Sequence, residues 1–585
     1  MKDQILKGYV EDFKTSFDVE VSDESTVFEH FVNYCVISKQ YPRDFEYDDI
    51  HVGGSDDIGL DGIAFVVNGN IVTSPEAIEY LLNQNGYLNV SFSFIQTKKS
   101  SSFKGDQVGT LIFGIKNFFD DHPSIPENEN IKRYRSIKDE VYRKSINLEK
   151  PPVLNVFFAT TGEWKEPAQI TGRVARELRD LENKCLFDKI NFIFMDAEKL
   201  KQTYREINRK TIKEIKFSNH VVLPEISGVR QAFIGSMPVK EYIELITDSD
   251  NELQKNLFED NVRDYQGSNK VNKDIKATIL NTQDQAALPI FNNGITIIAK
   301  KVEQVSNKIK LTDFQVVNGC QSSHVLFENK ASLLEDTHIV VKLIETADYD
   351  FATRVVKATN WQTEVKDEAF ESLKQFHRDL EEYYKAKSKS VLNPIYYERR
   401  SKQYSWSPTV KSSQLVSLST QINAYVAAQL AQPQSTHRYY GELLNSNRSK
   451  MFQPGSNLEP YYISALLLKR IDHAFRNASL DPNYKVFKYH LLYLCYQFYE
   501  KKIEFLSNYN YENIIDDISK GDEILKVYNA GLNIIKTSLQ SLRLSKADAS
   551  RSKAFTDSIR SEMFRQFPPT NVTKLPAGRA KSARR

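Results

Sequence analysis

Four short stretches near the N-terminus carry residue types that together suit metal-assisted hydrolysis of a phosphodiester. Asp61 follows a glycine-rich turn, and Gln96, Thr97 and Lys98 end an apolar–polar alternating run 35 residues further on. Magnesium prefers hard oxygen ligands, which the Asp61 carboxylate, the Gln96 side-chain carbonyl and the Thr97 backbone carbonyl can supply. Because strand side chains alternate between faces, Lys98 shares a face with Gln96, and its ammonium can stabilise developing negative charge. The spacing therefore predicts a Mg²⁺ site, with Mn²⁺ as a substitute.

Two further polar residues complete this candidate catalytic group. Glu29 lies on one predicted helix and Gln107 on another. We expect Glu29 to position Lys98 or to bind the metal through water, and Gln107 to steady Gln96 or the substrate. The alternative interpretation makes Asp61 a turn residue that accepts backbone hydrogen bonds, and Lys98 a solvated lysine at a sheet edge.

The order of these residues resembles the PD-(D/E)xK nuclease superfamily, in the Mrr-like variant that carries Gln-x-Lys in its last motif. The resemblance covers about residues 20–200 and rests on IGLDG before the strand IAF and on the end of the run FSFIQTKK. It implies a small mixed sheet between helices and metal-dependent phosphodiester hydrolysis. The usual acid of the last motif is Gln96 here, as it is in the Mrr-like variant.

A second set of polar residues surrounds two Asn-Gly turns in the middle of the chain. Asn293 and Gly294 lie in LPIFNNGITIIAK, and Asn318 and Gly319 lie in FQVVNGCQSS. Glycine tolerates the positive φ of such turns, and the amides at a helix N-terminus attract anions. These features indicate a phosphate or nucleotide site, for which the further candidates are Gln321, Ser322, Ser323, Arg263, Arg399 and Arg400. The alternative is that both turns only join secondary-structure elements.

Other candidates each have a structural explanation as well. Cys320 and His324 are one helical turn apart and can form a nucleophile–base pair. Asn360 and Gln362 can read a base or a ribose. The tyrosine pairs of the C-terminal half can stack on bases, but such aromatics are more typical of packing between helices. The chain has no GxxxxGK[ST], HExxH or CxxC motif, which excludes P-loop, zincin and CxxC zinc sites.

The middle of the chain resembles the AIPR family, the abortive-infection phage-resistance proteins. The resemblance rests on the ordered blocks LFEDNVRDYQGSNKVN, LPIFNNGITIIAK, FQVVNGCQSSHVLF, VVKATNWQTEVK and YYERRSK. The block VVNGCQSS is also similar to a divergent DGQHR or ParB-like core. The family resemblance implies a role in defence against phage, with a region that senses or clamps nucleic acid or nucleotide.

The charge of the chain is unevenly distributed. Residues 1–120 hold 9 Lys and Arg against 19 Asp and Glu, a net charge of −10, although the whole chain carries +2. An acidic segment attracts nucleic acid poorly, so the rest of the chain or a bound metal must help to hold such a substrate. No run of about 20 apolar residues and no secretory signal is present, which favours a soluble cytoplasmic protein without a membrane partner.

The predicted fold class has three parts. Alternating helices and strands indicate an α/β N-terminal restriction-endonuclease-like domain with a mixed sheet flanked by helices, followed by a central α/β ParB/DGQHR-like block. The later periodicity indicates an all-α C-terminal region. The predicted domains are a nuclease domain (1–205), a helical connector (206–219), a central α/β core (220–350), a helical region (351–570) and a basic disordered tail (571–585).

The candidate residues and the nuclease resemblance predict a cytoplasmic protein that cleaves DNA with Mg²⁺, and the AIPR resemblance implies that it acts in defence against phage. Because one catalytic site cuts one strand, cleavage of a duplex favours a homodimer. Two alternatives stay open: a non-catalytic nucleic-acid or nucleotide-binding regulator with a decayed nuclease fold, and a nuclease that cleaves RNA.

Overall fold

The computed structural model of the chain forms two compact units, Met1–Arg378 with Glu398–Ser412 and Asp379–Tyr397 with Ser413–Arg585. The structure describes residues 3–21, 23–41, 45–208, 211–248, 251–258, 270–360, 371–372, 374–399, 403–404, 407, 409–505, 509–519 and 522–566. Arg263, Gln362, Arg400 and the predicted basic tail 571–585 lie outside these residues.

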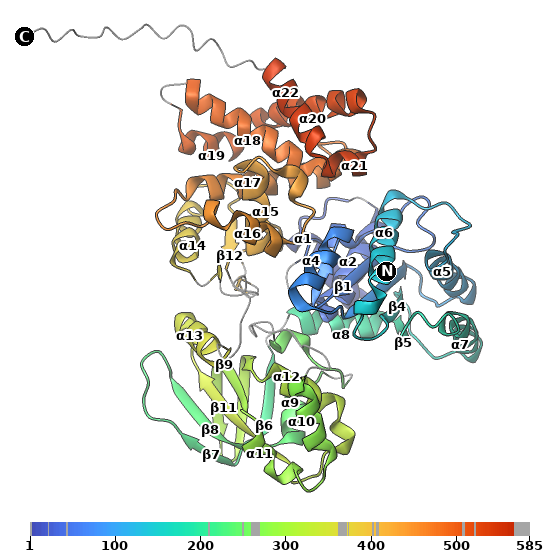
Figure 1. Cartoon of the computed structure of the whole chain (residues 1–585), viewed down its shortest axis with the longest axis vertical. Coiled ribbons are helices and arrows are strands. Elements are labelled where there is room, and N and C mark those ends of the chain that lie inside the picture. The colour runs from blue at the N-terminus through green and yellow to red at the C-terminus, as the bar shows by residue number, and fades with distance from the viewer. Residues whose placement is uncertain are drawn as a thin grey trace, which may run out of the picture. The chain divides into compact units, whose positions relative to one another are not determined.

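A five-stranded mixed sheet forms the first part of the first unit (Figure 1). Its strands, in chain order, are β1 (Gly62–Val67), β2 (Asn70–Val72), β3 (Val90–Lys98), β4 (Val153–Thr160) and β5 (Lys189–Met195). The spatial order is β2-β1-β3-β4-β5. Strand β1 runs antiparallel to β2 and β3, whereas β3, β4 and β5 are parallel. The mixed α/β character predicted for this part is confirmed.

Helices cover both faces of this sheet. They are α1 (Gln4–Ser16), α2 (Glu24–Gln40), α3 (Tyr47–Ile50), α4 (Pro75–Asn85), α5 (Gly105–Phe118), α6 (Glu129–Arg143), α7 (Ala168–Glu182) and α8 (Ala197–Asn208). Helices α1, α2 and α8 share one apolar core with the sheet residues Ala64 and Ile95. On the other face, Phe65 of β1 contacts the rings of Phe118 in α5 and Tyr134 in α6. The sheet, whose strands β1 and β3 carry the candidate site, is therefore packed between two layers of helices.

A six-stranded sheet forms the second part of the same unit, in the order β6-β10-β9-β11-β8-β7. The strands are β6 (Ile212–Lys216), β7 (Asn219–Val222), β8 (Gln231–Pro238), β9 (Ile295–Val305), β10 (Lys308–Asn318) and β11 (His338–Glu345). The accompanying helices are α9 (Val239–Ile246), α10 (Lys270–Leu280), α11 (Leu288–Phe291), α12 (Cys320–Glu328) and α13 (Tyr349–Asn360). Only β9 and β11 pair in parallel among these described strands.

The connector between the two sheets differs from the prediction. A helix was expected over 206–219, but β6 occupies Ile212–Lys216 and β7 begins at Asn219. Ile215 is buried and pairs with Ile309 of β10. Pairing with a distant strand thus overrides the helical tendency of a short charged segment. Both sheets fall in one compact unit, which comprises Met1–Arg378 and Glu398–Ser412.

The second unit is mainly helical, which confirms the helical C-terminal region. Its helices are α14 (Gln375–Lys387, which begins in the first unit), α15 (Leu418–Ala428), α16 (Tyr440–Asn447), α17 (Glu459–Arg476), α18 (Lys488–Phe505), α19 (Tyr511–Ser519), α20 (Asp522–Leu542), α21 (Lys546–Arg551) and α22 (Lys553–Gln566). The short strands β12 (Tyr396–Glu398) and β13 (Leu415–Ser417) pair beside them. The tyrosines Tyr384, Tyr397, Tyr461 and Tyr462 are buried, as the packing interpretation expects.

No described helix is both long enough and apolar enough to cross a membrane. Cys35, Cys320 and Cys495 are buried and Cys185 is exposed, and none of the four forms a disulfide.

Candidate functional site

The pairing of β1 with β3 brings Asp61 to the end of the Gln96–Lys98 stretch. Gly62 pairs with Ile95 across the antiparallel ladder, so Asp61 stands next to Gln96 and Thr97. The backbone amide of Asp61 donates to the Ile95 carbonyl at 2.9 Å. The glycine-rich loop before β1 therefore positions the Asp61 carboxylate beside Gln96 and Thr97 of β3.

The Asp61 carboxylate is buried and held by Thr97. Only 5% of Asp61 is exposed. Its Oδ2 accepts a hydrogen bond from the Thr97 amide at 2.6 Å and another from the Thr97 hydroxyl at 3.1 Å. Burial raises the pKa of Asp61, while the cation of Lys98 and the Thr97 hydrogen bonds oppose that rise. A buried carboxylate with a raised pKa beside one ammonium is a recurring feature of functional sites.

Gln96 presents a buried oxygen that lacks a protein donor. The residue is 2% exposed, and its Oε1 atom has no hydrogen-bond partner within the described part of the chain. The Oε1 atom of Gln107 on α5 is unpartnered in the same sense. A buried polar atom without a partner costs about 1–3 kcal/mol, so such an atom calls for an explanation, and an unseen ion is one.

Glu29 of α2 faces the same charges. Burial and then the negative charge of Asp61 raise the pKa of Glu29 to about 7, and the cation of Lys98 opposes this shift. Nδ1 of His51 lies 3.9 Å from Oε2 of Glu29. Asp57 acts weakly on Glu29 as well. The structure thus brings together the predicted residues Glu29, Asp61, Gln96 and Lys98.

Sequence analysis assigned neither His51 nor Asp57 to this group. Asp57 holds the turn, because its carboxylate accepts from the amides of Gly59 at 2.8 Å and Gly54 at 3.2 Å. Its charge nevertheless raises the pKa of both Asp61 and Glu29. The run of acids around Asp57 was the available signal for this effect, whereas no local pattern around His51 indicates its place beside Glu29.

The donor set suits a hard divalent cation. Asp61 and Glu29 offer carboxylate oxygens, and Gln96 offers an unpartnered amide oxygen. Mg²⁺ typically takes one or two carboxylates and keeps several waters, so it does not need a larger protein cage. Within the described residues there is no group of three or more His, Cys, Asp or Glu side chains that could hold a metal ion. Ligation by the Thr97 carbonyl stays a prediction.

The second candidate group forms two adjacent turns in the six-stranded sheet. Strand β10 ends at Asn318, Gly319 has φ +96°, and α12 begins at Cys320. A Cβ atom on Gly319 would lie 2.4 Å from Cδ1 of Ile295, so both the backbone and the space require glycine. The strand–turn–helix predicted for VVNGCQSS is confirmed.

The other Asn-Gly turn lies against the first one. The side-chain amide of Asn292 donates to Oγ of Ser322 at 2.8 Å. The backbone amide of Gly294 donates to Oδ1 of Asn292 at 2.9 Å. Asn293, between them, is exposed. The two turns therefore meet, as the sequence predicts.

Most polar side chains at the start of α12 already have protein partners. Ser323 donates to the Gly319 carbonyl at 2.7 Å, and its Oγ lies 2.6 Å from the hydroxyl of Tyr242. Gln321 accepts from the Asn272 amide at 2.8 Å, and these two residues have further interactions. These bonds give the turns an architectural role, and phosphate binding here stays a prediction.

Arg399, His324 and Cys320 are further predicted residues of this region that the structure describes. Arg399 is buried, and its guanidinium donates to the Ser372 carbonyl at 3.4 Å. Burial and the nearby cation of Lys255 lower the pKa of His324 to about 3, so its imidazole is neutral at physiological pH. Cys320 is buried beside the turn, and burial disfavours the thiolate that a nucleophilic role requires.

A comparison with protein families gives one finding for the later part of the chain. Residues 258–545 match the family model described as AIPR protein. This stretch, called the AIPR region below, is similar to that family. The AIPR region includes the two Asn-Gly turns, α12 and most helices of the second unit. The first sheet and the Asp61 group precede it. Neither a curated protein nor a solved structure matches the chain.

Proposed function

We propose that the protein defends its cell against phage, and that its first α/β part is a metal-dependent endonuclease. The AIPR region supports the defence role, because the AIPR family suggests abortive infection. The observation that carries the nuclease proposal is the buried Asp61 carboxylate beside the unpartnered Gln96 oxygen and the Lys98 ammonium.

In this proposal, Asp61 and Gln96 would hold Mg²⁺ directly, and Glu29 would hold it directly or through water. When bound, the ion would supply polarisation of a phosphoryl oxygen and activation of a water molecule. Thr97 fixes one oxygen of Asp61 by its two hydrogen bonds and leaves Oδ1 for the ion. Lys98 stabilises the charge that develops on the phosphate.

Glu29 is suited to exchange a proton at neutral pH. A group with a pKa near the working pH has useful populations of both protonation states. The raised pKa of about 7 therefore suits Glu29 to take a proton from a water molecule, in addition to orienting Lys98.

The mixed sheet between helices agrees with a restriction-endonuclease-like fold. Asp61 is the last residue of the loop before β1, and β3 carries Gln96 and Lys98 on one face. A ParB-like relation of the six-stranded sheet is a further proposal, supported by the Asn318-Gly319 turn before α12.

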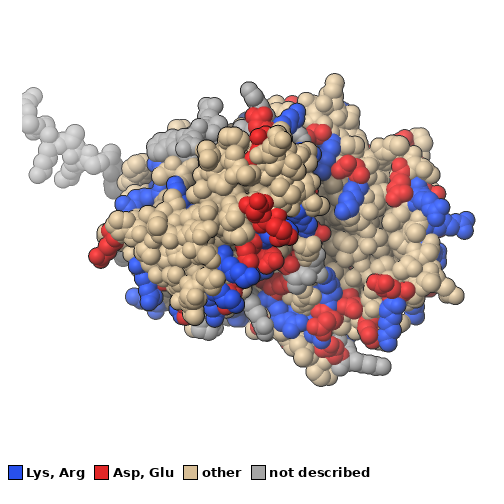
Figure 2. Space-filling model, turned by 90° about the horizontal axis from the view of Figure 1, so that it is seen from below, with Lys and Arg blue, Asp and Glu red and all other residues tan. Residues whose placement is uncertain are grey.

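We propose DNA as the substrate, cytoplasmic action and a homodimer for duplex cleavage. On the face drawn in Figure 2, basic side chains lie among acidic ones and form no continuous basic surface. On this face, substrate contacts are therefore expected from separate lysines and arginines. We propose the AIPR region as a sensor of nucleic acid or nucleotide.

The test compares duplex DNA, single-stranded DNA and RNA of one sequence with Mg²⁺, Mn²⁺ or excess EDTA. We expect both metal ions to support cleavage of duplex DNA and EDTA to stop it. Cleavage of RNA alone would identify an RNA nuclease. Binding without metal-dependent cleavage of any substrate would favour the non-catalytic regulator.

A further inference from the structure

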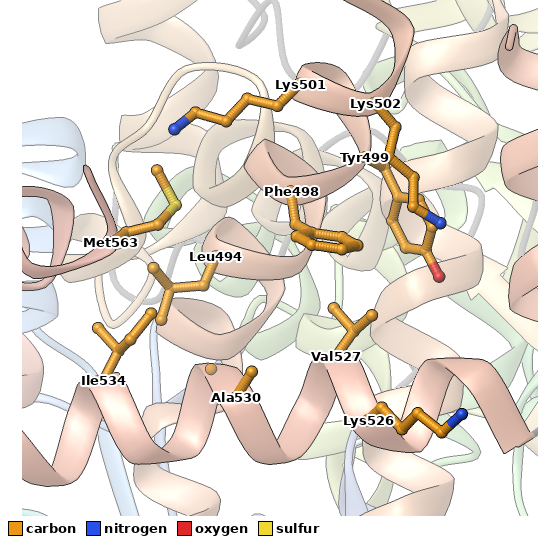
Figure 3. Close-up of a pocket in the computed structure, with 11 residues that line it drawn as sticks. Leu494, Phe498, Tyr499, Lys501, Lys502, Lys526, Val527, Ala530, Ile534 and Met563 are labelled. Carbon is orange, nitrogen blue, oxygen red and sulfur yellow. The ribbon is translucent and has the colours of Figure 1, made fainter. Parts of the chain in front are cut away.

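A cavity of about 330 Å³ opens among three helices of the second unit (Figure 3). Val527, Ala530 and Ile534 rise from α20 toward Leu494 and Phe498 of α18, and Met563 of α22 closes one side. The volume lies at the lower end of the range for small-molecule sites. The cavity is far in sequence from the Asp61 group and plays no part in the proposed cleavage.

The wall is apolar, and its polar groups are few. Apart from backbone atoms, the only polar groups in the lining are the Tyr499 hydroxyl and three lysine ammonium groups. A nucleobase would bury several donors and acceptors against such a wall, and each unpaired group would cost about 1–3 kcal/mol. The lining therefore favours a ligand with a hydrocarbon body.

The three lysines stand at the two ends of the cavity. Lys502 and Lys526 lie at one end in Figure 3, and Lys501 lies at the other end, near Met563. The Lys501 ammonium stands 4.3 Å from the ring centre of Phe564, and burial lowers its pKa, while the negative charge of Glu504 opposes that shift. Lys502 is 3.2 Å from Asp517, so part of its charge is already compensated.

We propose that this cavity binds a small amphipathic anion of the medium-chain fatty acid type. The hydrocarbon body lies against the α18, α20 and α22 side chains, and the carboxylate lies at Lys501 or Lys526. An apolar wall with a lysine ammonium at its end is complementary to that ligand in both charge and polarity.

The test measures binding of decanoate, decanol, decylamine and AMP to the full-length protein by calorimetry. We expect decanoate to bind, decanol to bind at least about tenfold more weakly, and decylamine and AMP to bind more weakly still. Equal binding of decanoate, decanol and decylamine would show a nonspecific apolar surface and overturn the proposal. Preference for AMP would identify a nucleotide site, and absence of decanoate binding at millimolar concentration would also overturn it.

Variants locate the site. The double substitution Lys501→Met and Lys526→Met keeps the side-chain stems and should weaken decanoate binding at least about tenfold, with little effect on decanol. Lys536→Met removes a charge from the same helix, outside the cavity, and should leave decanoate affinity unchanged. Ala530→Phe should fill the cavity and abolish binding of decanoate while the thermal midpoint shows that the protein is folded. Equal losses in the double variant and Lys536→Met would contradict the assignment.

Discussion

The Thr97 amide donates a 2.6 Å hydrogen bond to Oδ2 of Asp61, and the Thr97 hydroxyl donates to the same atom. One oxygen of the carboxylate is therefore anchored to the strand that carries Gln96 and Lys98. The Oδ1 atom accepts no hydrogen bond from the described residues and stays available to a ligand. Sequence analysis assigned Thr97 a metal-binding carbonyl, and its role as a donor to Asp61 adds to that prediction.

The pKa of Glu29 should depend on Asp61. Because the charge of Asp61 contributes to the raised value of about 7, the substitution Asp61→Asn should lower the pKa of Glu29 toward its ordinary value. Carbon-detected NMR titration of the Glu29 carboxyl group measures this directly. An unchanged pKa would mean that the two carboxylates do not interact.

The same shift predicts a pH dependence of stability. Between the ordinary value of 4.5 and the folded value of about 7, the folded state binds more protons at Glu29 than the unfolded state does. The free energy of unfolding therefore falls as pH rises through this window. Glu29→Gln should raise the thermal midpoint at pH 8 but not at pH 4, whereas the exposed control Glu79→Gln should show no such difference. A Glu29→Gln effect that is equal at both pH values would contradict the assignment.

Gly319 should not tolerate a side chain. With φ at +96° and a Cβ position 2.4 Å from Ile295 Cδ1, Gly319→Ala should reduce the free energy of unfolding by more than about 1 kcal/mol. Gly172→Ala is the matched control, because it lies within α7 with nothing within 4 Å of its Cβ position. That control should stabilise the protein by about 0.5–1 kcal/mol. Chemical denaturation measures both, and a neutral Gly319→Ala would contradict the turn geometry.

Ser322→Asp tests phosphate binding at the start of α12. A carboxylate there would occupy the place of a phosphate, so affinity for nucleotides or nucleic acid should fall while folding persists. Ser322→Ala, which adds no charge, should have a smaller effect on affinity. Unchanged affinity in Ser322→Asp would leave the turns with an architectural role alone, in line with the hydrogen bond from Asn292 to Ser322.

Local patterns in the sequence predicted the first sheet well. The alternation that ends at Lys98 corresponds to β3. The residues Asn68-Gly69, a pair typical of tight hairpin turns, lie between β1 and β2. The segment Ile212–Lys216 could not be predicted in this way, because its strand conformation depends on pairing with β10. Local residue types therefore sufficed wherever the partner strand was close in the chain.

The same limit applies to the candidate sites. The sequence could indicate that Asp61 and Gln96 belong to one site, because a single antiparallel pairing, that of β1 with β3, places them side by side. Nothing in the sequence places Arg399 beside Ser372, or Tyr242 beside Ser323 at 2.6 Å. These contacts join residues from separate elements, and they decide which polar groups remain available to a ligand.

The proposed nuclease site is tested most directly by the rate at which the variants Asp61→Asn and Lys98→Met cleave DNA, compared with the unaltered protein. A preorganised electrostatic group contributes about 2.7–4 kcal/mol to transition-state stabilisation, so each substitution should lower the single-turnover rate with Mg²⁺ at least about 100-fold. Lys99→Met is the matched control, since Lys99 pairs with Glu24 and should leave the rate within a few-fold of the original. Thermal midpoints close to that of the unaltered protein would establish that the variants are folded. Cleavage at the original rate by Asp61→Asn and Lys98→Met would contradict the proposed nuclease site.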